Sequence, residues 1–347
     1  MADRFARVDR VLRDACGRRF TGAVARIERG GKPAFEAAYG TTRADDGARA
    51  VFVDTRFDLA SITKLFVATL ALQLVAAGTL ELDGPLTGIF PEWSGTPHAA
   101  ITLRMLLAHT SGMNSGADYR TILGENVERF ALVRPLAGTP GGGVIYSDLG
   151  FISLGSAIER ASGRSLGAIA AHAFARPLLS FTPRGPERAQ IPATEDDGWR
   201  GRVQGSVHDE KAHLMGGVAG HAGLFGTAAD VAWLAEPYLA VANGRPQSLL
   251  RAEIAREAIT EQAYDPVLRR GLGWALKTSD ENSCGRLFGA QSFGHTGFVG
   301  TCVWADPARD VSGVLLTNSV YFGRSDTREL RAAFYEAAIE DLEEMRA

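Results

Sequence analysis

Residues 21–40 read TGAVARIERGGKPAFEAAYG, and this stretch predicts two β-strands joined by a tight turn. Apolar and polar side chains alternate on both sides of Gly30 and Gly31, a residue pair that suits a short hairpin turn. Three more strand-like runs occur only near the other end of the chain, LGWALK (272–277), SFGHTGFVGTCVWAD (292–306) and SGVLLTNSVYF (312–322). Strands that are this remote in sequence most simply join one mainly antiparallel sheet.

Helices are expected near both ends of the chain and throughout its middle. Phe5, Val8 and Leu12 fall on one face of an amphipathic surface helix, and residues 327–345 form a closing helix. Between the two sets of strands, helices are predicted from residue 61 to about 78, in 101–113, over 117–135, after the glycine loop at 141–143, and in 228–244. Segment 179–205 is Pro-rich and long for a structureless loop, which favours a lid or a pocket wall.

The predicted fold class is therefore α/β (α+β), with two regions and a cleft between them. A mainly antiparallel sheet flanked by helices is assigned to residues 1–75 and 265–347. A mostly helical lobe that carries active-site loops is assigned to residues 76–264.

Composition excludes several classes of function. Net charge is −3 and no basic run stands out, so neither a nucleic acid nor a membrane is expected as a partner. The apolar run from Leu65 to Ala77 is too short to span a bilayer, and the charged N-terminal segment has no apolar core for a signal peptide. Three widely spaced cysteines suit a reducing compartment, and we expect a cytoplasmic location.

The segment FDLASITKLF (57–66) places Ser61 and Lys64 three residues apart at a helix start. Residues i and i+3 share one helix face, so the lysine can reach the serine hydroxyl. An ammonium buried among apolar neighbours is costly, so the pKa of Lys64 is expected to fall, and a lysine of this kind can activate a serine. The alternative is a solvated lysine at a helix start, because short patterns recur by chance.

Two further motifs follow in order, Tyr146-Ser147-Asp148 in GGGVIYSDLG and His295-Thr296-Gly297 in FGHTGFVG. Together with the Ser-x-x-Lys pair and LLAHTSGM (106–113), they resemble the serine β-lactamase and penicillin-binding-protein superfamily. The resemblance covers nearly the whole chain and is greatest to the esterase branch that is related to class C β-lactamases.

The resemblance implies a role for each motif residue. Ser61 matches the nucleophile, Lys64 its partner, and Tyr146 the residue that moves a proton between nucleophile and leaving group. The backbone N–H groups of Ser61 and Phe298 match an oxyanion hole. The substrate-binding residues would be Asp148, His295, Thr296, Gly297 and His221. Gly297 is expected because a side chain there would obstruct an acyl group lying along the strand.

Two positions depart from the family pattern. His295 stands where lactamases usually carry lysine, and a mostly neutral histidine weakens a clamp for a substrate carboxylate, so weak or no β-lactamase activity is expected. Asp148 stands in place of asparagine; it could hold Lys64 protonated and leave Tyr146 as the base, or it could bind a substrate ammonium. A different alignment would make Ser147 the proton shuttle, although the long spacing from Ser61 favours Tyr146.

Residues 205–234 contain four side chains that invite a metal-site interpretation: His208, Asp209, His213 and His221. Their spacing is awkward for one helix face and no thiolate joins them, so no metal is predicted. His208 and Asp209 are expected to fix a loop, and His221 to line the pocket. Of the other histidines, we expect His109 to bond loop backbone, and His98 and His172 to lie on the surface.

The sequence thus predicts a serine hydrolase that forms an acyl-enzyme on Ser61, needs no cofactor, and acts on small carboxylic esters or amides as an esterase or a D-aminopeptidase-like enzyme. One alternative is an acyltransferase or transpeptidase that uses the same acyl-enzyme. Another is a non-catalytic binding relative. The sequence leaves the oligomeric state open.

Overall fold

The predicted hairpin is present in the computed structural model, which describes residues 2–116 and 118–345. It consists of β1 (Gly22–Arg29) and β2 (Lys32–Gly40). Gly30 and Gly31 take φ angles of 59° and 70°, which glycine adopts without strain. The glycine pair therefore forms the tight turn that the sequence indicated.

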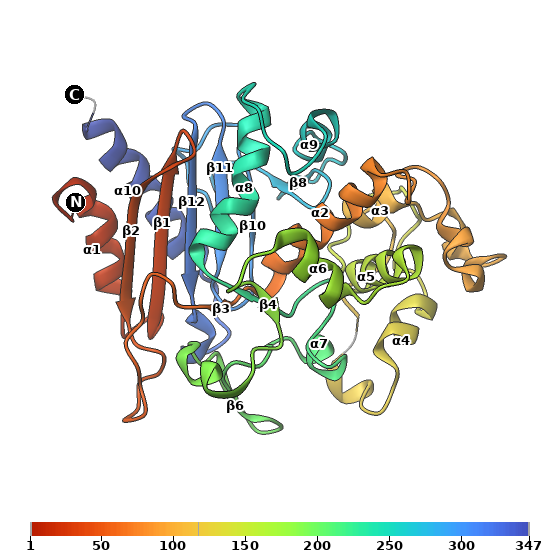
Figure 1. Ribbon diagram of the computed structural model, residues 1–347, viewed down its shortest axis with the longest axis horizontal. Coiled ribbons are helices and arrows are strands. Elements are labelled where there is room, and N and C mark those ends of the chain that lie inside the picture. Colours follow the sequence, from red (N-terminus) through yellow and green to blue (C-terminus); the bar gives the residue numbers. More distant parts are fainter. Residues whose placement is uncertain (1, 117, 346–347) are drawn as a thin grey trace.

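One seven-stranded sheet joins the two ends of the chain in the order β2-β1-β12-β11-β10-β9-β8, and every neighbouring pair is antiparallel. Its C-terminal strands are β8 (Arg269–Arg270), β9 (Ala275–Leu276), β10 (Phe293–Thr296), β11 (Cys302–Asp306) and β12 (Val311–Thr317). Strand β12 lies directly beside β1, with Leu316 opposite Val24 (Figure 1). This is the predicted sheet, except that run 292–306 is divided by a turn into two strands.

Helices cover both faces of the sheet. Helices α1 (Ala6–Ala15) and α10 (Arg328–Glu344) pack against each other on one face, and α8 (Ala228–Ala242) covers the other (Figure 1). Val8, Leu12 and Phe334 are fully buried between helices α1 and α10 and the sheet. Each such side chain contributes about 1.5–3 kcal/mol through its burial, and the amphipathic first helix is confirmed.

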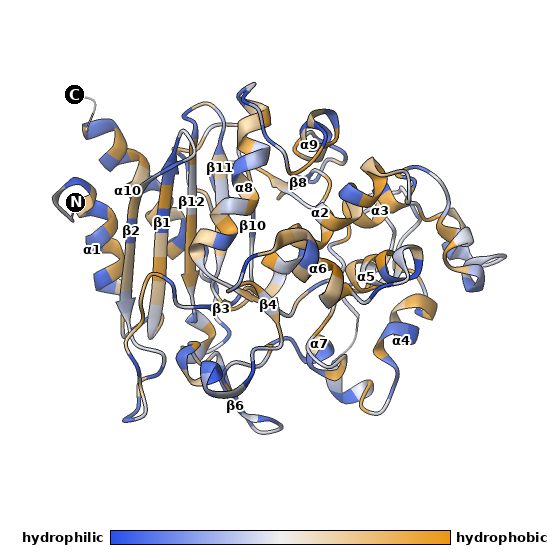
Figure 2. Cartoon of the chain, viewed as in Figure 1, coloured by the Kyte–Doolittle hydropathy of each residue, from blue (hydrophilic) through white to orange (hydrophobic). Residues whose placement is uncertain are grey.

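The helical lobe lies on the side of α8 that faces away from the sheet (Figure 1). Its helices, with the connecting helix α9, are α2 (Thr63–Ala76), α3 (Leu103–Leu107), α4 (Val127–Val133), α5 (Asp148–Ser162), α6 (Leu166–Phe174), α7 (Glu210–Leu214) and α9 (Ala252–Ala258). Helix α2 is buried from Thr63 to Leu72. Figure 2 shows apolar colour along it, as expected for a helix inside a core. The boundaries at residues 75/76 and 264/265 stay a prediction.

Short elements connect these parts. The 3-10 turns are η1 (Ala2–Phe5), η2 (Ala60–Ile62), η3 (Leu86–Gly88), η4 (Pro91–Trp93), η5 (Pro97–Ala100), η6 (Tyr119–Thr121), η7 (Gly185–Gln190) and η8 (Ser319–Phe322). A three-stranded sheet has the order β3-β7-β4, and β5 pairs with β6. These strands are β3 (Phe57–Asp58), β4 (Ser180–Phe181), β5 (Glu195–Asp197), β6 (Gly201–Val203) and β7 (Leu224–Gly226).

One segment prediction was wrong. Residues 118–135 are not one helix, because Gly124 takes a positive φ of 81° and the Asn126 side chain caps a new helix, α4; residue 117 lies outside the described residues. Segment 179–205 contains β4, η7 and the hairpin β5–β6, in agreement with the expectation that it is too long for a structureless loop. Its role as a lid or pocket wall stays a prediction. Within 2–116 and 118–345, no helix is both long and apolar enough to cross a membrane.

Candidate active site

Ser61 lies in the 3-10 turn η2, directly before α2 rather than inside the first turn of that helix. The preceding residue, Ala60, takes a left-handed φ of 46°, a conformation that costs an L-residue about 1–3 kcal/mol. The buried Asp58 carboxylate holds this turn by accepting the N–H groups of Ala60 (2.8 Å) and His208 (2.7 Å). Asp58 thus joins the turn that presents Ser61 to His208, which lies 150 positions after Asp58.

Lys64 connects Ser61 to two distant segments. Its Nζ donates to Ser61 Oγ (3.0 Å), to Asp148 Oδ1 (2.9 Å) and to the His221 carbonyl oxygen (3.1 Å). The lysine side chain is 0% exposed. An ammonium has three N–H donors, so these three acceptors satisfy it completely.

The predicted fall of the Lys64 pKa is wrong. Burial of the ammonium does lower its pKa, but the charge of Asp148 and the neighbouring Tyr146 hydroxyl raise it by more. Asp148 is the first residue of α5, where the helix dipole favours a carboxylate. The geometry agrees with the alternative in which Asp148 holds Lys64 protonated.

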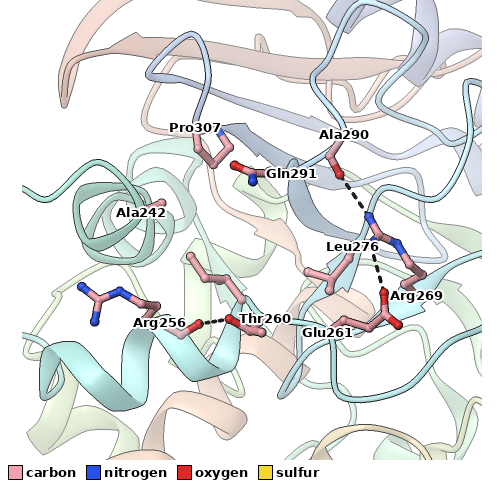
Figure 3. Close-up of a pocket in the computed structure, with 10 residues that line it drawn as sticks. Ala242, Arg256, Thr260, Glu261, Arg269, Leu276, Ala290, Gln291 and Pro307 are labelled. Carbon is pink, nitrogen blue, oxygen red and sulfur yellow. Dashed lines mark hydrogen bonds and ion pairs between the residues drawn. The ribbon is translucent and has the colours of Figure 1, made fainter.

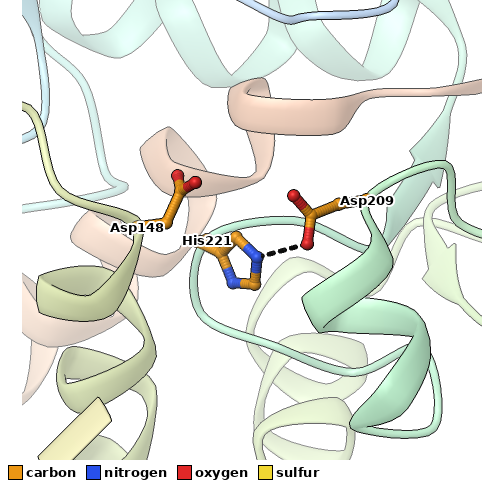
Figure 4. A group of neighbouring side chains, drawn as sticks. All are labelled: Asp148, Asp209 and His221. Atoms are coloured by element: carbon orange, nitrogen blue, oxygen red, sulfur yellow. Dashed lines mark hydrogen bonds and ion pairs between the residues drawn. The ribbon is translucent and has the colours of Figure 1, made fainter. Parts of the chain in front are cut away.

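A second layer of charged groups supports this pair. Asp148 Oδ2 lies 3.3 Å from Lys211 Nζ, which in turn is 3.6 Å from Asp209 Oδ2. Asp209 Oδ1 accepts a hydrogen bond from His221 Nε2 at 2.7 Å (Figure 4). Burial disfavours the ionised form of Asp209, but His221 and Lys211 keep its pKa well below the ordinary value.

Asp148, Asp209 and His221 could in principle hold a metal ion, because one ligand atom of each lies within 4.8 Å of the others. However, the Lys64 and Lys211 ammonium groups already contact these carboxylates. A divalent cation would be repelled by both charges at short range. The cluster is therefore explained by charge balance around Lys64.

His221 contacts the site differently from its prediction. Its ring is fully buried and bonded to Asp209, and its backbone carbonyl is the group that contacts Lys64. A side chain enclosed in this way supports the site from behind instead of presenting a surface to a ligand. The expectation that the His221 ring lines an open pocket therefore does not hold.

Tyr146 is surrounded by cations and rings. Lys64 Nζ lies 5.0 Å and Arg270 Cζ 5.3 Å from the centre of its ring. The rings of His109 and His295 have their centres 4.6 and 6.2 Å away. Sequence reasoning did not single out Arg270, because nothing local shows which way its strand turns it.

His109 and Ser147 fix the loop that carries Tyr146. His109 Nδ1 accepts the Ser147 N–H at 3.0 Å, which confirms that this ring bonds loop backbone. Burial holds the pKa of His109 well below its usual value. The Ser147 hydroxyl donates to the Asn114 carbonyl and accepts the Gly150 N–H, both at 2.7 Å, as the N-cap of α5. This use of its hydroxyl disfavours Ser147 as the proton shuttle.

His295 is a buried, neutral residue of β10. Its Nδ1–H donates to the Thr296 carbonyl at 2.8 Å, which leaves Nε2 without a proton. Burial and the charges of Lys64 and Arg270 lower the pKa of His295 to about 3. The expectation that this position carries no permanent charge is therefore consistent with the structure.

Gly297 is required for a reason other than the predicted one. A Cβ atom there would lie 2.1 Å from Thr301 Oγ1 and 2.8 Å from the Leu59 carbonyl oxygen. Thr301 Oγ1 also donates to that carbonyl at 3.2 Å. Glycine thus lets the end of β10 pack closely against the residues before Ser61.

The carbonyl group and the N–H group of the peptide bond between Gly297 and Phe298 point to opposite sides. Arg331 Nη2 from α10 donates to the Gly297 carbonyl at 2.6 Å. In a trans peptide the following N–H points to the opposite side, and the Phe298 N–H meets no acceptor among residues 2–116 and 118–345. The Phe298 side chain is 57% exposed and stacks on His208. The role of this N–H as an oxyanion donor stays a prediction.

Three other histidines differ in their burial and in their contacts. His98 was expected on the surface but is buried, because its Nε2 bonds the Arg134 carbonyl oxygen at 3.0 Å. His172 is exposed as predicted. His208 Nε2 bonds Glu195 Oε2 at 2.5 Å, which joins the loop after β6 to hairpin β5–β6 as expected.

A separate cavity of about 390 Å³ lies beside α9 and β9 (Figure 3). Arg256, Glu261 and Arg269 are among its lining residues, and none of the predicted site residues belongs to it. The Ser61 site and this cavity are therefore distinct.

The antiparallel sheet, the helical lobe and a serine bonded to a buried lysine define a serine acyl-enzyme hydrolase. The chain belongs to the β-lactamase family, because residues 8–338 match the family model described as Beta-lactamase. Two curated relatives are a putative D-alanyl-D-alanine carboxypeptidase of Escherichia coli strain K12, 32% identical over 79% of this chain and 71% of that protein, and Esterase EstB of Burkholderia gladioli, 33% identical over 95% of each chain.

A solved structure with the same fold is that of EstCE1, a hydrolase with promiscuous acyltransferase activity. Its TM-score is 0.77 at 21% identity, over 96% of this chain and 99% of that one. At this identity the likeness concerns the fold alone. The superfamily, the fold class and the enzyme class predicted from the sequence are confirmed.

Proposed function

We propose that the chain hydrolyses small carboxylic esters or amides through an acyl-enzyme on Ser61. The observation that carries the proposal is the bonding of Lys64, whose buried ammonium donates at once to Ser61 Oγ, to Asp148 and to the His221 carbonyl. A lysine held in this way fixes the serine hydroxyl beside a permanent positive charge. The relatives named as esterase and carboxypeptidase support the substrate class.

The proton pathway follows from the state of Lys64. A lysine with a raised pKa and three filled donors does not take the serine proton. Tyr146 is the remaining candidate base, since its ring centre lies 5.0 Å from Lys64 Nζ. That cation stabilises the negative charge that develops on the phenolic oxygen as the proton moves. Tyr146 then gives the proton to the leaving group. In the second step it takes a proton from the water that attacks the acyl-enzyme and returns it to Ser61 Oγ as the acyl–oxygen bond breaks, and the N–H groups of Ser61 and Phe298 bind the oxyanion in both steps.

Two features narrow the substrate. The neutral His295 gives no fixed charge for a β-lactam carboxylate, so β-lactams are expected to be poor substrates. Asp148 is a poor ligand for a substrate ammonium, because both of its oxygens already contact lysines. As to location, we propose that the protein acts in the cytoplasm.

The test is intact-protein mass spectrometry after treatment with a fluorophosphonate. One adduct is expected on the wild type and on Ser162→Ala, a matched serine at the opposite end of α5 whose hydroxyl bonds the Ile158 carbonyl, and none on Ser61→Ala. Lys64→Ala and Tyr146→Phe should each lower kcat/KM on a phenyl ester by several powers of ten. A folded wild type without an adduct would favour the non-catalytic binding relative.

An acyltransferase would differ only in its acceptor. Amines or alcohols added to the ester assay would then raise turnover and appear in the product. Hydrolysis that is unaffected by such acceptors supports water as the natural acceptor.

A further inference from the structure

Arg331 of α10 is a buried cation that reaches the peptide bond between Gly297 and Phe298. The residue is 8% exposed, and its Nε is enclosed and forms no hydrogen bond. Its Nη2 donates to the Gly297 carbonyl at 2.6 Å. The same carbonyl accepts the Gly300 N–H at 3.1 Å, so the turn after β10 is closed without the arginine. What Arg331 adds to this turn is therefore a positive charge.

No acid balances this charge in the part of the chain that the structure describes, because none of the ion pairs there includes Arg331. The charge of Asp326 reaches it, but that carboxylate lies 3.9 Å from Nε of Arg328, an exposed residue one turn earlier on the helix. Cys302 and Tyr335 also lie nearby. Burial raises the pKa of both groups, so neither is an anion at neutral pH. The guanidinium thus acts on the carbonyl without a counter-ion.

The peptide bond carries the effect of this charge to its other side. Its carbonyl and its N–H point in opposite directions. A charge-assisted hydrogen bond is about twice as strong as a neutral one, and hydrogen bonds in a chain polarise one another. Donation from Arg331 to the Gly297 oxygen therefore draws electrons from the peptide nitrogen and makes the Phe298 N–H a better donor. A negative charge that this N–H binds would in turn reduce the cost of the buried cation.

We propose that Arg331 is a positioning residue for the reaction, which directs and polarises the Phe298 N–H through the Gly297 carbonyl. The inference rests on the proposed function, in which this N–H binds the oxyanion. Arg331 does not touch the substrate, because the peptide lies between them. Its effect is confined to the steps in which negative charge forms on the reacting carbonyl oxygen, so it raises kcat and leaves substrate binding unchanged.

Hydrolysis of phenyl acetate by three variants measures this effect. Arg331→Met removes both the charge and the donor, Arg331→Gln retains a neutral donor, and Arg331→Lys retains the charge. We expect Arg331→Met to lower kcat by about 5- to 50-fold, less than the hundredfold or more that loss of an oxyanion donor costs, with KM unchanged within about twofold. Arg331→Lys should recover more of kcat than Arg331→Gln. Arg328→Met makes the same change one turn away and should keep the wild-type values.

The carbonyl stretch of an acyl-enzyme measures the polarisation directly. Cinnamoyl imidazole, isotope-labelled at its carbonyl carbon, should leave a cinnamoyl ester on Ser61 whose stretch is read by infrared difference spectroscopy. Stronger hydrogen-bond donation to the carbonyl oxygen lowers its stretching frequency. We expect a higher frequency in Arg331→Met than in the wild type, an intermediate one in Arg331→Lys, and the wild-type one in Arg328→Met.

Other results would overturn the proposal. An unchanged kcat in Arg331→Met would refute it, and so would a change in KM alone. A lower kcat with an unchanged carbonyl frequency would mean that the arginine only stabilises the fold. If Arg331→Met does not fold, the other two variants decide, and equal kcat values and equal frequencies in Arg331→Lys and Arg331→Gln refute a role for the charge. A wild type that forms neither the fluorophosphonate adduct nor the cinnamoyl ester would overturn the proposed function itself, and this inference with it.

Discussion

Replacing Asp148 by asparagine tests whether this carboxylate is what keeps the buried Lys64 charged. The substitution leaves the shape of the side chain almost unchanged but removes the counter-ion 2.9 Å from Nζ. Breaking a buried ion pair by removing one partner costs about 3–5 kcal/mol. We expect the lower end, about 3 kcal/mol at pH 7, because the new amide oxygen and the His221 carbonyl can still accept from the ammonium.

The loss should depend on pH in a defined direction. In the wild type the folded-state pKa of Lys64 lies above its unfolded value, so its contribution is complete below about pH 10.4 and lost only above that pH. Burial is already the largest single effect on the Lys64 pKa, and in Asp148→Asn the carboxylate no longer offsets it, so the folded-state pKa falls below the unfolded value. The destabilisation is then greatest at neutral pH, and it shrinks by up to about 1.4 kcal/mol per pH unit as Lys64 loses its proton.

Urea unfolding followed by circular dichroism at pH 7 and pH 10 measures both effects. Asp83→Asn is the matched control, since it makes the same chemical change in an exposed ion pair with Arg104. The control should lose less than about 1 kcal/mol of unfolding free energy relative to the wild type. This loss should be the same at pH 10 as at pH 7. A difference of less than about 0.5 kcal/mol between Asp148→Asn and the wild type at pH 7 would refute the reasoning, as would a difference that stays constant with pH.

Three further predictions concern single positions. Gly297→Ala should lower kcat/KM on a phenyl ester by more than about tenfold, since its Cβ would lie 2.8 Å from the Leu59 carbonyl and displace the Phe298 N–H; wild-type rates would contradict this. His295→Gln should leave the shape of the kcat/KM profile unchanged between pH 5 and 8, because the pKa of His295 is lowered to about 3; an inflection near pH 6.5 that disappears in the variant would count against it. The pKa of Glu195 is lowered to about 2, mainly by its hydrogen bond with His208, so its contribution is present above about pH 4.3 and lost toward pH 2. Glu195→Gln should therefore be less stable than wild type at pH 7, with a gap that closes on acidification, and a gap constant from pH 7 to 3 would contradict the assignment.

The elements that the sequence predicted well are those whose signals are local. The glycine pair of the first hairpin, the amphipathic face of α1 and the long helices α8 and α10 depend on side chains within one or two turns. Spaced motifs predicted the family in the same way. Chain order and residue type were enough to bring Ser61 and Lys64 together, because both lie within four positions.

The features that the sequence did not predict depend on distant partners. The apolar neighbours of Lys64 suggested a falling pKa, whereas the deciding carboxylate comes from a residue 84 positions away. His98 looked exposed because the carbonyl that it bonds lies 36 positions later. Arg269 and Arg270 form an ordinary basic pair in sequence, and only the direction of β8 sends one to a cavity and the other to Tyr146.

The position of β12 between β1 and β11 has a consequence for how the chain is made. Arg29 of β1 pairs with Val311, about 280 residues later. At ribosomal rates this partner is synthesised roughly 15–60 s after the hairpin. One edge of β1, with Val24 and Ile27, stays open during that time and could pair wrongly with other strands. The central pairing of the sheet can therefore form only after almost the whole chain has been synthesised.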